Sequence, residues 1–384
     1  RSFEVLERKG QKWHLFGYVA LAGNYILMMF YTTVAGWMLK YFFDTAKGDF
    51  IGATTSQVKD HFTYMNSVPS KMIFWTVVVI IIGFLVCSLG LQNGVEKISK
   101  GMMIALLVIM AVLAMNSIFL KGASKGLYFY LVPDFQQIKN IGLINVLVAA
   151  MNQAFFTLSI GMGSMTIFGS YLSKDHSLLG ESINIVALDT FVAIVSGLII
   201  FPSCFAFGVN PDQGPSLIFV TLPNIFIKMP GGRIIGSCFF IFMAFAAFST
   251  VIAVFENIMS SCMDLWGWGR KKTALINTIL IIIGSIPCVL GFNILSGFHP
   301  LGKGTNVMDL EDFLVSNLIL PIGSLIYTLF CTSKYGWGWD NYLKEVNTGN
   351  GLKVPGKIRF YCKWILPLVT LFIIVNGLIS VFNK

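Results

Sequence analysis

Long apolar runs alternate with short polar stretches along almost the whole chain of 384 residues. Each run has about the length that crosses a bilayer as an α-helix, which needs roughly 20 residues. The pattern predicts nine membrane-spanning helices, which cover residues 14–43, 71–92, 101–120, 143–172, 182–208, 234–263, 273–294, 312–331 and 360–381. Because no soluble domain interrupts these runs, we expect a single all-α, polytopic transmembrane domain over residues 1–384.

Composition and charge fit this picture. Hydrophobic residues make up 55% of the chain and charged residues 12%, which excludes a soluble globular protein. If the N-terminus is cytoplasmic, the inner segments hold 16 Lys and Arg residues and the outer segments ten. Such an excess orients membrane proteins in the lipid bilayer. We therefore expect a multi-pass protein of the cell (inner) membrane, with the N-terminus of this chain cytoplasmic and its C-terminus outside. The net charge of +9 then reflects topology and not a nucleic-acid partner.

The chain offers little for metal or covalent chemistry. Its seven cysteines include no CxxC pair, and its four histidines are scattered at span ends and in loops. No nucleophile–base pair and no metal cluster is visible, which argues against an enzyme and against an organic cofactor.

The fourth predicted span contains an unusually polar stretch, QAFFTLSIGMGS, at residues 153–164. A continuous helix could use these small residues to pack against a neighbouring helix. Alternatively, the backbone opens there, as it does where membrane helices form ion and substrate sites. The residues of this stretch alone leave both interpretations open.

Two acidic residues, Asp189 and Glu256, lie well inside predicted spans. An aspartate at bilayer depth costs at least about 2.5 kcal/mol, so each is a candidate functional residue, the alternative being a structural carboxylate hydrogen-bonded across helices. Ser249 and Thr250 form a second oxygen cluster, although such hydroxyls commonly bond back to their own helix. Tyr31 carries a phenol far from the membrane interfaces, with a bond to a neighbouring carbonyl as its structural alternative.

Several motifs resemble one known family in sequence order. They are FYTTVAGW, QAFFTLSIGMGSMTIFGSYL, PDQGPSLIFVTLP, FSTVIAVFE and DLEDFLVSNLILPIG. Together they resemble the neurotransmitter:sodium symporters, the LeuT-like sodium-coupled amino-acid transporters, over essentially the whole chain. The resemblance implies the LeuT-like inverted-repeat fold, with the nine spans corresponding to helices three to eleven of the bacterial eleven-helix branch. It therefore implies that 153–164 is the broken sixth helix.

The resemblance also assigns roles to individual residues. For sodium it implies Thr157 and Asp189 at a first site, with Gln153 beside them, and Ala246, Ser249 and Thr250 at a second. For the substrate it implies a pocket formed by Leu27, Tyr31, Phe156, Thr157, Ser159, Met162, Thr250 and Val254. For the gates it implies Phe156 as a lid, Asp312 on the outside, and Asp264 supported by Tyr171 on the inside. Glu256 receives no role from it.

We expect sodium-coupled symport of a neutral, hydrophobic or aromatic amino acid by alternating access. Because Asp189 places a fixed negative charge where relatives often have Asn, we expect transport to be chloride-independent. The family's first two helices have no counterpart here, so we expect an N-terminally incomplete domain that does not transport by itself. An ion channel or a non-transporting membrane protein is the alternative, and the oligomeric state stays open.

Overall fold

The computed structural model describes residues 2–90, 96–209, 211 and 214–382. Within these residues, eight helical stretches are long and apolar enough to cross a membrane. They are α2 (Leu15–Lys47), α4 (Pro69–Ser88), α5 (Lys97–Ile118), α10 (Leu178–Ala206), α12 (Gly232–Trp266), α13 (Arg270–Leu290), α14–η3–α15 (Val307–Asp312, Phe313–Ile319, Leu320–Thr332) and η4–η5–α17 (Gly356–Ile358, Tyr361–Ile365, Leu366–Phe382). They correspond to eight of the nine predicted spans and confirm the all-α membrane architecture.

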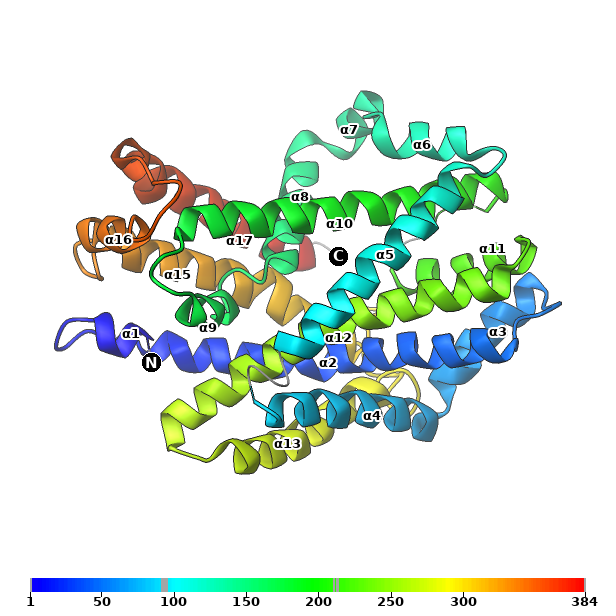
Figure 1. Ribbon diagram of the computed structural model, residues 1–384, viewed down its shortest axis with the longest axis horizontal. Coiled ribbons are helices and arrows are strands. Elements are labelled where there is room, and N and C mark those ends of the chain that lie inside the picture. Colours follow the sequence, from blue (N-terminus) through cyan, green and yellow to red (C-terminus); the bar gives the residue numbers. More distant parts are fainter. Residues whose placement is uncertain (1, 91–95, 210, 212–213, 383–384) are drawn as a thin grey trace.

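The long helices lie side by side, with α2 and α12 as the central pair (Figure 1). Helices α4 and α13 pack on this pair. Helix α5 crosses the pair obliquely and also packs against α10. We call one end of the bundle the α1 end; there lie α1 (Ser2–Leu6), α9 (Ser164–Tyr171) and α16 (Trp339–Val346). The opposite end, the α3 end, holds α3 (Thr55–Ser67), α6 (Ala123–Leu131), η2 (Leu217–Thr221) and α11 (Leu222–Lys228).

Small residues allow the helices to approach closely. A Cβ atom at Gly83 of α4 would lie 2.7 Å from the ring of Phe255 on α12, so only glycine fits there. Next to it, the rings of Phe84 and Phe255 stack with their centroids 3.9 Å apart. Gly36 of α2 likewise faces the backbone of α4, where an added Cβ would lie 3.0 Å from the nitrogen of Thr76. Lipid tails are as apolar as the helix surfaces, so the hydrophobic effect does not drive membrane helices together. Close van der Waals contacts of this kind hold them together instead.

The fourth predicted span is not a continuous helix. Helix α8 (Leu143–Thr157) stops at Thr157, and α9 begins only at Ser164. The six residues between them contain three left-handed backbone conformations, with φ of +50° at Ser159, +101° at Gly161 and +85° at Gly163. A helix cannot continue through such residues. The interpretation that the backbone opens within 153–164 is therefore confirmed, and residues 158–163 are called the break below.

Boundaries differ from the prediction mainly where capping and turn residues act. The predicted span 312–331 begins earlier, at Val307, because Asn306 and Asp309 form a capping box through each other's backbone N–H groups. Helix α7 (Phe135–Ile141) precedes α8 and meets it at 94°, with Gly142 at the corner.

Candidate functional site

A cavity of about 230 Å³ lies against the break. Its lining comes from α2, α8, the break, α10, α12 and the η3–α15 segment, and comprises Leu27, Tyr31, Gln153, Phe156, Thr157, Ser159, Met162, Asp189, Thr250, Val315 and Leu320. Seven of the eight residues predicted for a substrate pocket line this cavity. The eighth, Val254, is buried in α12 at 2% exposure and does not line it. Residues distant in sequence thus meet where the helix opens.

A polar pair forms one wall of the cavity. The Thr157 hydroxyl donates a hydrogen bond to the Asp189 carboxylate, with 2.9 Å between Oγ1 and Oδ1. Thr157 is also the last residue of α8, where the carbonyl end of the helix carries partial negative charge. Carboxylate, hydroxyl and carbonyl oxygens are the ligands that hard cations prefer. The two residues predicted for a first sodium site are therefore adjacent, on two separate helices, and Gln153 lines the same cavity.

The second predicted oxygen cluster lies on α12. The Ser249 hydroxyl donates to the carbonyl oxygen of Ala246 at 2.8 Å, which is the back-bonding that adjacent hydroxyls commonly adopt. One residue further, Thr250 lines the cavity together with Tyr31 from α2. The three residues of this cluster thus lie within five consecutive positions of α12, and of the three Thr250 lines the cavity.

The break is held against α15 by two glycines. A Cβ at Gly161 would overlap the carbonyl oxygen of Leu320 and lie 2.7 Å from the nitrogen of Ser324. In return, a Cβ at Gly323 would overlap the carbonyl oxygen of Gly161. This backbone-to-backbone contact brings Val315 and Leu320 into the cavity wall, and sequence reasoning missed both. Nothing in the sequence distinguishes them from other apolar residues of their span.

The predicted gate residues lie at different levels of the bundle. Phe156 lines the 230 Å³ cavity, whereas Asp264 lines a second cavity, of about 290 Å³, at the α1 end. Asp312 is exposed and accepts a hydrogen bond from the Ser316 hydroxyl at 2.7 Å. Tyr171 is the last residue of α9, and its side chain lies outside the described part of the chain.

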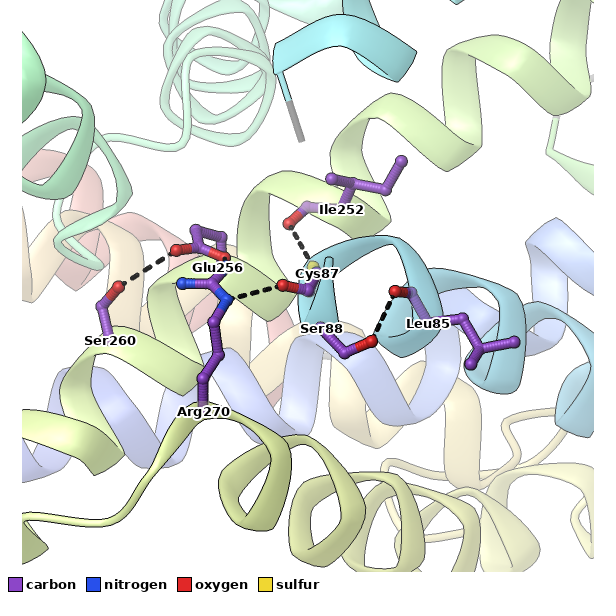
Figure 2. A network of polar contacts seen from close by, with 7 residues as sticks. All are labelled: Leu85, Cys87, Ser88, Ile252, Glu256, Ser260 and Arg270. Carbon is purple, nitrogen blue, oxygen red and sulfur yellow. Dashed lines mark hydrogen bonds and ion pairs between the residues drawn. The ribbon is translucent and has the colours of Figure 1, made fainter. Parts of the chain in front are cut away.

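Glu256 belongs to a different network, shown in Figure 2. It is completely buried, and its carboxylate is paired with Arg270 at the start of α13. Arg270 also donates from Nε to the carbonyl oxygen of Cys87, 2.7 Å away near the end of α4, where a cation compensates the helix dipole. This network joins α4, α12 and α13 and does not reach the cavity, which favours the structural interpretation of Glu256.

Comparisons with known proteins agree with this geometry. The model of the sodium:neurotransmitter symporter family matches residues 55–384. An uncharacterized sodium-dependent transporter of Bacillus subtilis, YhdH, is 32% identical over 375 residues, covering 96% of this chain and 81% of that protein. A second, from Haemophilus influenzae, is 28% identical over 373 residues, covering 95% and 79%.

Among solved structures, that of MhsT in complex with L-phenylalanine is similar to this chain, with a TM-score of 0.85 and 34% identity. The similarity covers 96% of this chain and 82% of MhsT. MhsT has the LeuT fold, as predicted for this chain. The chain therefore belongs to the sodium:neurotransmitter symporter family: it is a multi-pass, sodium-dependent membrane transporter with the LeuT fold, and not an enzyme.

Proposed function

We propose that this protein moves a neutral, hydrophobic or aromatic amino acid across the membrane together with sodium, without chloride, by alternating access. The observation that carries the proposal is the cavity of about 230 Å³ at the break, with the Thr157–Asp189 pair on its wall. Broken helices next to a mid-bundle cavity are the ion and substrate sites of secondary transporters.

The chemistry of the lining supports this substrate class. Leu27, Phe156, Met162, Val315 and Leu320 present apolar surface to the cavity. We assign the substrate carboxylate to the Tyr31 hydroxyl and its amino group to the carbonyls around Phe156, Thr157 and Ser159. The single acidic side chain among the lining residues, Asp189, already bonds Thr157, which disfavours a substrate with a second amine. The presence of L-phenylalanine in the related MhsT supports an aromatic substrate.

Two sodium sites fit the oxygen clusters. We assign Thr157 and Asp189 to the first, with Gln153 beside them, and the Ala246 carbonyl, Ser249 and Thr250 to the second. Because Asp189 brings its own negative charge to the first site, a bound cation there is balanced without an added anion. Sodium also draws the oxygens of the break together, so a bound ion favours the backbone geometry that the substrate needs.

Phe156 serves as the lid of the cavity, with Asp312 in the outer gate and Asp264 in the inner gate. The excess of Lys and Arg in the segments of the α1 end supports a cytoplasmic location for that end, in the cell membrane. Closing the lid and opening the α1 end would then release substrate and sodium inward. The membrane potential contributes about 2.3 kcal/mol per charge at 100 mV.

Binding to the full-length protein in detergent tests the proposal. Labelled L-phenylalanine should bind in sodium buffer and not in choline buffer, and leucine, tyrosine and tryptophan should compete while lysine and glutamate do not. Replacing chloride with gluconate should leave binding unchanged. Displacement by lysine would refute the substrate class, and a loss of binding in gluconate would refute chloride independence.

A further inference from the structure

Two cavities meet at one residue of the break. Met162 lines both the 230 Å³ cavity and the 290 Å³ cavity at the α1 end, and its side chain is only 2% exposed. A Cβ at Gly23 of α2 would lie 3.1 Å from the Met162 sulfur, so α2 packs directly on this side chain. Met162 therefore lies between the proposed substrate site and the cavity at the α1 end.

Two asparagines fix the backbone at this residue. Asn24 of α2 donates from Nδ2 to the carbonyl oxygen of Met162 at 2.9 Å and to that of Ala20 at 2.7 Å. Asn257 of α12 donates to Asn24 Oδ1 at 3.2 Å and to the hydroxyl of Ser164, the first residue of α9, at 3.3 Å. We call Asn24 and Asn257 the amide clamp.

Burial makes the hydrogen bonds of the amide clamp important for the position of the break. Its members are 2% and 4% exposed, and a buried amide costs free energy unless it is hydrogen-bonded. They project from α2 and α12, the central pair, onto a segment that is not helical and whose backbone bonds include only single turns at Leu158, Ser159 and Ile160. The amide clamp therefore attaches the break to the central pair of helices, α2 and α12.

We propose that the amide clamp is a positioning device that keeps Met162 in place as the barrier between the two cavities, and that it is released when the α1 end opens. The inference rests on the proposed transport function. Asn24 and Asn257 position the backbone around the substrate without touching the substrate itself, because neither lines the 230 Å³ cavity. With the clamp intact, the conformation closed at the α1 end is favoured.

Asn24→Leu removes the Asn24 half of the amide clamp with little change of shape, because leucine has the same number and branching of side-chain heavy atoms. The contacts of Asn257 Nδ2 with the Ser164 hydroxyl at 3.3 Å and with the Met162 carbonyl at 3.5 Å remain. The bonds of Asn24 to the Met162 carbonyl and from Asn257 are both lost. Each such bond contributes roughly two- to tenfold to an equilibrium constant. Asn224→Leu is the matched control: Asn224 is also buried, and its amide donates to the carbonyl of Val220 in the preceding turn of its own segment.

The experiment is hydrogen–deuterium exchange of the full-length protein in sodium buffer, combined with uptake kinetics in proteoliposomes. In Asn24→Leu we expect the amides of 158–167 to exchange about tenfold faster, while those of α13 stay unchanged. We also expect the KM for external substrate to rise about tenfold with little change in maximal rate, because fewer molecules hold the conformation that binds outside substrate. Asn224→Leu should change neither quantity.

Unchanged exchange at 158–167, or an equal increase in α13, would overturn the proposal, since the second result indicates general destabilisation. A rise in exchange at 158–167 without any change in KM would also overturn it. If the unsubstituted protein binds no amino acid, the proposed function fails, and the exchange data alone then decide whether the amide clamp holds the break.

Discussion

Replacing Asp189 with asparagine tests the proposed role of this residue in sodium binding. The change keeps the size of the side chain and an oxygen that can accept the hydrogen bond from Thr157, now 2.9 Å long. It removes only the negative charge. Any effect on sodium binding therefore measures the charge and not the packing.

The magnitude follows from Coulomb's law. Two unit charges about 4 Å apart attract by roughly 1 kcal/mol in water and by roughly 4 kcal/mol at an effective dielectric constant near 20. Asp189 is half-buried, so its effect on a neighbouring sodium ion lies between these limits. We expect the sodium concentration for half-maximal uptake to rise by about five- to thousandfold, with about fiftyfold as the central value.

The assay is uptake of labelled phenylalanine by proteoliposomes at increasing sodium concentrations. Asp175→Asn serves as the control, because Asp175 is exposed in the loop before α10 and should leave the sodium dependence unchanged. A half-maximal sodium concentration in Asp189→Asn that stays within twofold of the original would refute the reasoning and remove Asp189 from the sodium site.

Three further substitutions test other parts of the account. Gly161→Ala should reduce uptake more than tenfold in protein that still folds. It forces alanine into a left-handed conformation, which costs about 1–2 kcal/mol, and the new Cβ overlaps the backbone of α15. Gly208→Ala carries only the conformational cost and should transport normally. Thr250→Val should raise the half-maximal sodium concentration about tenfold by removing one hydroxyl ligand, measured by uptake against sodium concentration. Glu256→Gln should lower the free energy of unfolding, measured by thermal denaturation, by about 3–5 kcal/mol, because the charge of a partly buried arginine loses its carboxylate partner. The sodium dependence of uptake by the folded protein should stay unchanged.

The sequence predicted those features that depend on local physical rules. Span positions follow from hydropathy, because a helix across lipid must be apolar along about 20 residues. The break was visible as glycines and hydroxyls inside a span, but only the resemblance decided between an opened backbone and close helix packing. Asp189 was recognised as a candidate functional residue because a carboxylate at membrane depth is costly without a partner.

Features that depend on tertiary contacts were not predicted. Val315 and Leu320 look like any other apolar residues, and they reach the cavity because Gly161 and Gly323 bring two backbones together. Asn24 is one of several polar residues in its span and nothing in the sequence sets it apart, and its bond to the break joins residues 138 positions apart.

Glu256 illustrates the same limit. Its partner Arg270 lies outside the predicted span 273–294, so the sequence left open whether Glu256 is a functional residue or a structural carboxylate bonded across helices. In the structure α13 begins at Arg270, which places the guanidinium beside the carboxylate (Figure 2). The residue that pairs with this carboxylate was not visible in the hydropathy pattern.

The most direct test of the central claim is concentrative uptake of labelled L-phenylalanine by the full-length protein in proteoliposomes under an inward sodium gradient. We predict accumulation above the external concentration that collapses when sodium is replaced by choline, persists when chloride is replaced by gluconate, and is lost in Asp189→Ala. Accumulation that is equal in sodium and choline would contradict sodium coupling at the 230 Å³ cavity, as would full activity of Asp189→Ala.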